Sequence, residues 1–203
     1  NNVLGKDHPA YPVVQIASTE RVLSIGENHP VPARAGDNPD WMRWNNLGIA
    51  YLDQEQYAAA VDAFHQVVKL RPDYPDAYTN IAVVEIPWGK YGSAWESVQR
   101  ALALNPHDAR ALYYAALLAR RAGRLQVELA DLVEVVKQYP QSRDARRELG
   151  VAYYRLGKDK DAVEQFEALQ VIDPDDLAAH YNLAILYRRM GMLDRRGRSR
   201  PSL

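Results

Sequence analysis

The stretch from Trp41 to Pro72 decides the fold, and it reads WMRWNNLGIAYLDQEQYAAAVDAFHQVVKLRP. A first helix is predicted by four residues at helical spacing: Trp44, Leu47, Gly48 and Tyr51. A second helix is predicted by Ala60, Phe64 and Val67. It should end before Pro72, because proline has no N–H and keeps the preceding residue out of the helical conformation. The stretch therefore encodes two helices with a tight turn, and we expect Trp44 in the core.

This pattern returns every 34 residues. The same point of each copy is marked by a proline: Pro72, Pro106, Pro140 and Pro174. The period divides the chain into units 41–74, 75–108, 109–142 and 143–176, and a partial fifth unit spans 177–194. One pair of helices cannot bury its apolar face alone, so neighbouring units should stack into an array.

Two units depart from the pattern. Pro87 and Trp88 stand where the first helix of the second unit should still continue, so that helix should end early. In the third unit, Glu128 occupies a position at which the other three units have alanine. Because the two helices cross there, Glu128 predicts either a wider crossing or a side chain that extends outward to solvent.

The repeated residues resemble the tetratricopeptide repeat, whose signature is aromatic–x₂–Leu–Gly–x₂–Tyr, then Ala, Phe and Pro within one unit. The resemblance covers residues 41–194. It implies an all-α, right-handed superhelical solenoid of helix–turn–helix units, with a non-repeat N-terminal extension. It also implies that the first helices line a concave groove and the second helices form the convex back. The groove would bind an extended peptide, so the chain is predicted to be a protein–protein interaction scaffold.

Carried over position by position, the resemblance assigns the groove to Asn45, Asn46, Ile49, Asn80, Tyr113, Arg120, Arg147, Tyr154, Tyr181, Asn182 and Arg188. Asn46, Asn80 and Asn182 share a position at which some members hold a peptide backbone with carboxamides, which both donate and accept hydrogen bonds. Tyr114 and Glu148 interrupt that ladder. The lysine and asparagine clamp of chaperone-binding members is missing, because Asn45 and Ile49 stand where it would start.

Arginines and tyrosines at groove positions of units three to five predict a basic, aromatic inner surface that suits an acidic and apolar peptide. Arg110, Arg120, Arg147 and Arg188 would supply the charge, with Arg121 and Arg155 near the edge. The alternative is that these arginines pair with Asp144, Glu148 and neighbouring acids. At least one of Tyr113 and Tyr114 should face the groove or lie at its edge, since adjacent helix residues point in different directions.

The last helix, at about 177–190, lacks a second helix of its own, so its uncovered side should seek another surface. We therefore predict self-association through Leu183, Leu186 and Tyr187. A homo-oligomeric assembly module is thus an alternative function to peptide binding. An accessory part of a larger enzyme is a third.

Composition excludes several classes of chemistry. The 203 residues contain no cysteine, which removes disulfides and thiolate metal sites. The formal net charge of −1 gives no reason to expect nucleic acid as a partner. The five histidines lack metal-site spacing, and no acid pair or glycine-rich loop forms a catalytic motif. We therefore predict a protein that is not an enzyme, with no metal and no cofactor. No apolar run is long enough to span a membrane, and the compartment stays open between cytoplasmic and periplasmic.

The two ends lie outside the repeats. Residues 1–40 hold five of the twelve prolines, and the β-prone runs 13–17 and 21–25 predict a hairpin on the first repeat or, alternatively, a linker. The absence of an initial methionine indicates a processed product or a fragment. Residues 195–203 are arginine-rich and predict a disordered tail, either an artefact of the reading frame or a basic anchor.

Overall fold

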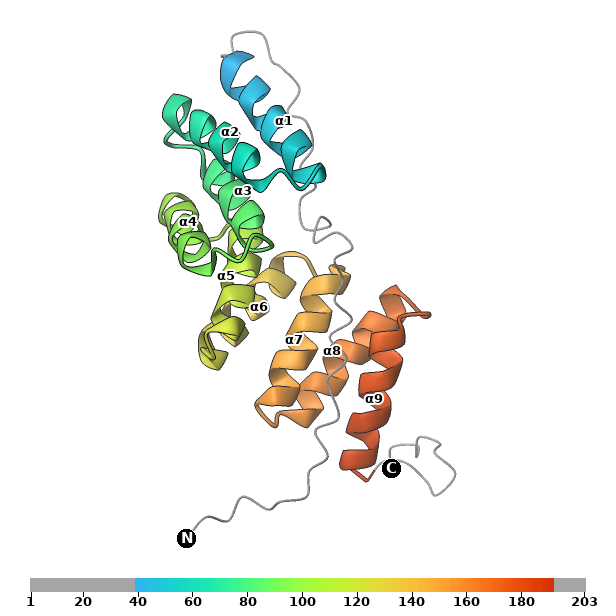
Figure 1. The fold of residues 1–203 in the computed structure, drawn as a ribbon. Helices are drawn as coiled ribbons and strands as arrows, with labels where there is room; N and C mark the ends of the chain where they lie inside the picture. Colours follow the sequence, from blue (N-terminus) through green and yellow to red (C-terminus); the bar gives the residue numbers. More distant parts are fainter. Residues whose placement is uncertain (1–38, 192–203) are drawn as a thin grey trace.

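The computed structural model describes residues 39–191, and within them it contains helices and no strand (Figure 1). In chain order the helices are α1 (Pro39–Asp53), α2 (Tyr57–Leu70), α3 (Pro75–Glu85), α4 (Tyr91–Leu104), α5 (Ala109–Arg121), α6 (Leu125–Gln138), α7 (Arg143–Arg155), α8 (Asp159–Ile172) and α9 (Leu177–Arg189). The predictions for the hairpin and the basic tail concern residues outside this described range.

The helices form an elongated stack of antiparallel pairs (Figure 1). Each first helix packs on its own second helix, and each second helix packs on the first helix of the next unit. The buried apolar side chains form clusters that each join helices of neighbouring units. This arrangement confirms the all-α superhelical solenoid, in which burial depends on adjacent units instead of one central core.

The helix boundaries follow the period of the sequence. The second helices end two residues before the repeated prolines, at Leu70, Leu104, Gln138 and Ile172. At the start of α5, α7 and α9, the side chains of Asp108, Ser142 and Asp176 accept hydrogen bonds from backbone N–H groups three residues later. The early end of α3 at Glu85 confirms the effect predicted for Pro87.

Trp44 is not a core residue, contrary to our prediction. Its exposed fraction is 39%, and that of Leu47 is 37%, whereas Trp41 is 5% exposed. At the same repeat position as Leu47, Leu149 is buried, because the second helix of the preceding unit covers it. No described helix precedes α1, so the corresponding face of α1 has no such cover.

The side chain of Glu128 does not extend to solvent, which was one of the two predicted outcomes. Its side chain is 1% exposed, and its carboxylate accepts two hydrogen bonds from Nη1 of Arg155 on α7, at 2.9 and 3.1 Å. Burial raises the pKa of Glu128, while the charges of Arg155 and Arg120 lower it. The polar group that replaces alanine is thus retained inside by a cation from the next unit.

Candidate functional site: the inner face of the first helices

One apolar side chain from each first helix is partly exposed at the same repeat position. These residues are Ile49, Val83, Leu117, Val151 and Ile185. Two positions earlier in the units, Ile81, Leu149 and Leu183 are buried, with exposed fractions of 3%. The helical period therefore directs one aliphatic row into the core and a second row to an accessible surface along the first helices. We call this second row the aliphatic row.

The predicted asparagines form a polar site beside the aliphatic row. Nδ2 of Asn80 donates to Oδ1 of Asn45 over 3.0 Å, and both side chains are 3% exposed. Oδ1 of Asn80 and Oδ1 of Asn46 are buried and have no hydrogen-bond partner in the described part of the chain. Asn182 instead donates to the backbone oxygen of Ala178 in its own helix, over 2.8 Å. The two unpaired amide oxygens of units one and two can each accept an N–H group.

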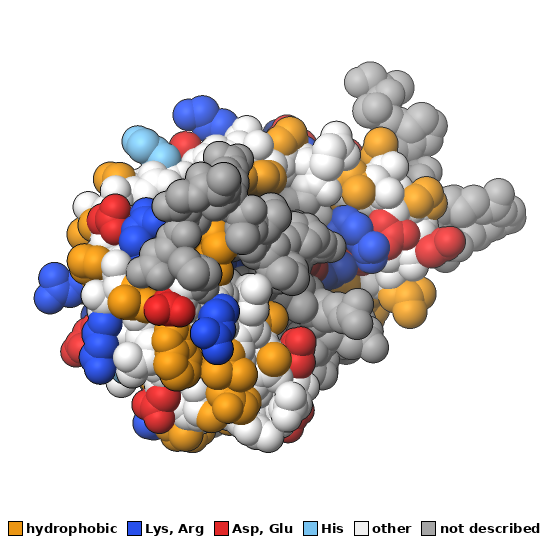
Figure 2. Space-filling model, turned by 90° about the horizontal axis from the view of Figure 1, so that it is seen from above, with side chains coloured by type: hydrophobic (Ala, Val, Ile, Leu, Met, Phe, Trp, Pro, Cys, Tyr) orange, Lys and Arg blue, Asp and Glu red, His pale blue; other side chains and the backbone are white. Residues whose placement is uncertain are grey.

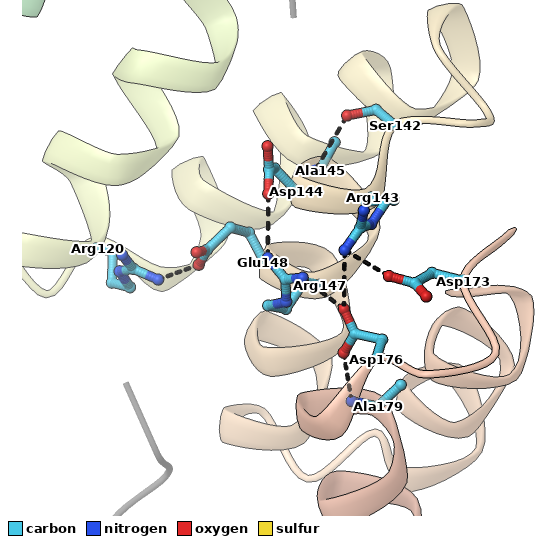
Figure 3. A network of polar contacts seen from close by, with 10 residues as sticks. All are labelled: Arg120, Ser142, Arg143, Asp144, Ala145, Arg147, Glu148, Asp173, Asp176 and Ala179. Atoms are coloured by element: carbon cyan, nitrogen blue, oxygen red, sulfur yellow. Dashed lines mark hydrogen bonds and ion pairs between the residues drawn. The ribbon is translucent and has the colours of Figure 1, made fainter. Parts of the chain in front are cut away.

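The arginines predicted for the groove are mostly paired with carboxylates (Figure 3). Arg120 forms an ion pair with Glu148. Arg147 contacts Asp144 over 3.0 Å through Nη1 and Asp176 over 2.6 Å through Nη2. Arg120 and Arg147 therefore follow the alternative prediction, in which acidic side chains neutralise the groove arginines. The exposed Arg188 forms no ion pair with a described residue.

Asp176 is the centre of this polar network. It is 3% exposed on its side chain, and it also lies 3.9 Å from Arg143, which contacts Asp173 over 2.5 Å (Figure 3). Burial by itself would raise the pKa of Asp176, but the hydrogen bonds from Arg147 and from the N–H of Ala179 hold it below its usual value. Asp176 therefore remains ionised and joins α7 to the start of α9.

Charged side chains of both signs are interspersed with apolar ones on the surface seen in Figure 2. On the inner face of α5 and α7, the ion pairs of Arg120 and Arg147 reduce the basic character that the sequence predicted.

Tyr113 and Tyr114 are both buried, with exposed fractions of 3% and 4%, so the expectation that one faces the groove is wrong. Their rings contact edge to face with centroids 5.7 Å apart. Burial raises the pKa of both hydroxyls, and Asp144 of α7 contributes to each increase. The first helix of the next unit therefore covers side chains that a single helix would expose. Tyr154 is partly exposed, with Arg189 over its ring, and Tyr181 is 39% exposed.

The residues predicted to mediate self-association are buried or hydrogen-bonded within the chain. Leu183 and Leu186 are 3% and 0% exposed because they pack on α8, so they cannot form an intermolecular surface as predicted. Tyr187 donates its hydroxyl to Oε1 of Glu167 over 2.6 Å. The exposed apolar residues of α9 are instead Leu177, at 76%, and Tyr181.

Sequence reasoning missed one set of contacts that fasten successive units. A side chain at the fourth position of three units reaches the carbonyl of the proline six residues earlier. The pairs are Tyr78 with Pro72 at 3.2 Å, Arg146 with Pro140 at 2.5 Å, and His180 with Pro174 at 2.6 Å. The sequence feature that could have indicated these contacts is a hydrogen-bond donor at the same repeat position in three units. It indicates that His180 has a structural role.

Two further features concern residues 39–191. These residues contain no cluster of three or more histidine, aspartate or glutamate side chains that could hold a metal ion. No described helix combines the length and the apolar character needed to cross a membrane.

The family of this chain is shown by comparison with family models. Tetratricopeptide repeat models match residues 42–74 and 89–136, and a TPR repeat model matches residues 150–191. The chain belongs to the tetratricopeptide repeat family.

Individual relatives are distant. Superkiller protein 3 of Schizosaccharomyces pombe is 25% identical over 146 residues, which are 72% of this chain and 10% of that protein. A TPR repeat-containing protein of Rhizobium etli is 22% identical over 141 residues, covering 64% of this chain and 69% of that protein. The peroxisomal targeting signal receptor of Kluyveromyces lactis is 32% identical over 69 residues, 34% of this chain and 12% of the receptor. The chain thus spans only a small part of two of these relatives.

Solved structures of MamA share the fold. One has a TM-score of 0.67 with 20% identity, covering 75% of this chain and 83% of that chain. MamA from Desulfovibrio magneticus RS-1 has a TM-score of 0.68 with 18% identity, covering 76% and 87%. At this identity the likeness concerns the fold alone. Family and fold together define a protein-interaction scaffold.

Proposed function

We propose that this scaffold binds an extended segment of another protein along the inner face of its first helices. The observation that carries the proposal is the aliphatic row, which repeats on the first helices of five successive units and is only partly covered by the described part of the chain. An interaction surface needs accessible apolar area together with a few oriented polar groups. The aliphatic row supplies the first requirement.

The unpaired amide oxygens of Asn46 and Asn80 supply the second requirement. A buried acceptor without a donor is costly, and an N–H group of a bound peptide backbone would remove that cost after a small shift of either side chain. One relative is named a peroxisomal targeting signal receptor, which supports a receptor function for this repeat type. The proposed ligand is therefore an extended peptide with apolar side chains.

A preference for acidic side chains is proposed only at the end of the row, beside Arg188. Arg120 and Arg147 are occupied by carboxylates, so a ligand carboxylate would have to displace Glu148, Asp144 or Asp176 there. Arg188 is exposed and lies on α9 next to the partly exposed Ile185. The ligand should therefore be apolar over units two to four and acidic at unit five.

The test is selection of binding peptides from a random display library against the full chain. Selected peptides should lose binding when Leu117→Asp places a charge in the aliphatic row. The matched control is Val171→Asp, since Val171 is 84% exposed on the second helix α8. Equal binding by the parent and the Leu117→Asp variant, with both correctly folded by circular dichroism, would refute the proposal.

Self-assembly through the end of α9 is a second candidate, supported by the exposure of Leu177 and Tyr181. Sedimentation velocity over a range of concentrations tests it. We expect association that Leu177→Asp abolishes, and a strict monomer at high concentration would contradict it. A catalytic function is not proposed. One relative, human TMTC3, is named a protein O-mannosyl-transferase, but this chain spans 17% of it.

A further inference from the structure

A second surface lies along the turns that join the two helices of each unit. In units two and three, cationic side chains lie over aromatic rings at these turns. Nζ of Lys90 is 3.3 Å from the centroid of Trp88, Cζ of Arg121 is 3.6 Å from that of Tyr91, and Cζ of Arg124 is 5.2 Å from that of Trp95. We call these six residues the turn edge. Because Arg121 and Arg124 belong to unit three and their rings to α4 of unit two, the contacts connect neighbouring units.

The three cations of the turn edge are exposed, and within residues 39–191 they form no ion pair. Burial raises the pKa of the carboxyl group of Glu85, and Lys90 lies near enough for its charge to oppose that rise. Arg155 and Arg189 stand at the same repeat position as Arg121, but both form ion pairs. Arg155 pairs with Glu128 at 2.9 Å, and Arg189 pairs with Asp159 at 2.9 Å. Only unit three leaves this repeated arginine without a carboxylate.

Stacking on a ring prepares a cation for binding. The ring face attracts the positive charge and restricts the side chain. The N–H groups of a stacked guanidinium lie in its plane and remain able to bind a carboxylate with two parallel hydrogen bonds. Trp88 is itself held, since its ring stacks on Tyr57 with centroids 6.5 Å apart. The turn edge is thus a positioned set of exposed cations that form no ion pair with the described residues.

The basic surface is short. In unit one, the corresponding turn carries the exposed acids Asp53 and Glu55, and in units four and five Arg155 and Arg189 are neutralised. Lys158 of unit four, at the repeat position of Lys90 and Arg124, is exposed and lies 5.8 Å from the centroid of Tyr153. Proteins that bind double-stranded nucleic acid often contact about 6–10 phosphates. A few cations flanked by acids and ion pairs, in a chain of net charge −1, favour a shorter anionic partner.

We propose that the turn edge docks a short acidic segment of a partner protein, at a site separate from the inner face of the first helices. Helices pack about 8–10 Å apart and an extended chain advances about 3.3 Å per residue. Carboxylates in the partner should therefore recur every few residues, so that they meet the cations of both units. Apolar or aromatic side chains between them would contact the exposed ring of Trp88, which is 36% exposed.

The test measures binding of a fluorescein-labelled peptide, about twelve residues of alternating glutamate and serine, to the full chain by fluorescence anisotropy at low salt. The combined variant Lys90→Ala, Arg121→Ala and Arg124→Ala should weaken binding about tenfold or more. The matched control is Lys69→Ala, Arg100→Ala and Lys160→Ala. It removes the same charge from exposed, unpaired positions on α2, α4 and α8, and it should retain binding.

Further arms separate the site from its alternatives. Tyr91→Phe keeps the ring under Arg121 and should bind as the parent does, whereas Tyr91→Leu removes the ring and should bind more weakly. Leu117→Asp, on the inner face, should leave this binding intact. Equal weakening in the two charge variants, loss of binding in Leu117→Asp, or no binding of the peptide at all would overturn the proposal. Preferential binding of an oligothymidine strand or of phosphatidylserine vesicles would overturn it as well.

Discussion

The ring of Phe166 fills the space in which Gly150 would carry a Cβ atom, since an ideal Cβ there would lie 2.8 Å from Cζ of the ring. Gly48 and Phe64 have the same relationship, with 2.7 Å to Cε1. The pairs at these positions in units two and three are Ala82 with Val98 and Ala116 with Leu132. A larger residue on the first helix thus accompanies a smaller one on the second, so the sizes of the two positions are complementary within one chain.

Gly150→Ala should therefore destabilise the protein. Overpacking against Phe166 costs about 1–3 kcal/mol, and the better helix propensity of alanine returns at most about 1 kcal/mol. Adding Phe166→Leu recreates the pair of unit three, so the double variant should lose less than the sum of the single variants. Urea denaturation measures this cycle. As a control, Gly92→Ala in α4 should not destabilise, because no atom lies within 4 Å of its added Cβ. A neutral Gly150→Ala would contradict the packing explanation.

Trp44→Ala and Phe64→Ala should differ in cost despite both removing an aromatic ring of the repeat signature. Phe64 is 0% exposed, so its loss should cost about 3–5 kcal/mol. Trp44 is 39% exposed, and its loss should cost well below that range. Guanidinium denaturation of both variants checks the order. Equal costs would mean that Trp44 is covered in solution.

Asp131 should make the protein more stable as the pH falls from neutral. Burial raises the pKa of its carboxyl group to about 6, from an ordinary value of 3.8 in the unfolded chain. The unfolded state therefore ionises first as the pH rises, so stability present below pH 3.8 is lost as the pH increases through about 6.

Asp131→Asn should remove that loss and stabilise the protein at pH 7, on the order of 1–3 kcal/mol. Urea midpoints of the parent and the variant between pH 4 and pH 7 give the measurement, and the exposed Asp62→Asn serves as control. Parallel pH profiles for the parent and Asp131→Asn would show that Asp131 does not titrate in this range.

Arg147→Ala should weaken the attachment of α9 to α7. It removes the 2.6 Å contact to Asp176 and leaves a carboxylate that is 3% exposed with only the more distant Arg143 nearby. Because the side chain of Arg147 is itself 24% exposed, we expect a cost on the order of 1–3 kcal/mol. Faster hydrogen exchange of α9 amides would show it. Arg188→Ala, which breaks no ion pair among the described residues, should leave exchange unchanged.

The same pair has a defined pH dependence. Because Arg147 and the N–H of Ala179 lower the folded pKa of Asp176, their contribution is present above the unfolded pKa and is lost as the pH falls through the folded pKa. Arg147→Ala should reduce this acid sensitivity. Arg147→Glu would therefore disturb the fold. Arg188→Glu tests the effect of charge at the inner face without breaking an ion pair among the described residues.

The sequence by itself determined the elements of this protein and their order. The 34-residue period located the helix pairs, the prolines located the ends of α2, α4, α6 and α8, and Pro87 located the early end of α3. These features could be predicted because they depend on local backbone geometry and on side-chain spacing along one helix.

Tertiary structure alone decided which of the predicted site residues are accessible. Arg120 and Glu148 are 28 residues apart and Arg155 and Glu128 are 27 apart, so these pairs join units three and four, while Arg147 and Asp176, 29 apart, join α7 to the N-cap of α9. Tyr113, Leu183 and Trp44 were likewise assigned incorrectly because burial in a stacked array depends on the adjacent unit. A residue's position within the repeat specifies the direction of its side chain, but the neighbouring helix decides whether that direction leads to solvent, to a partner charge or into the core.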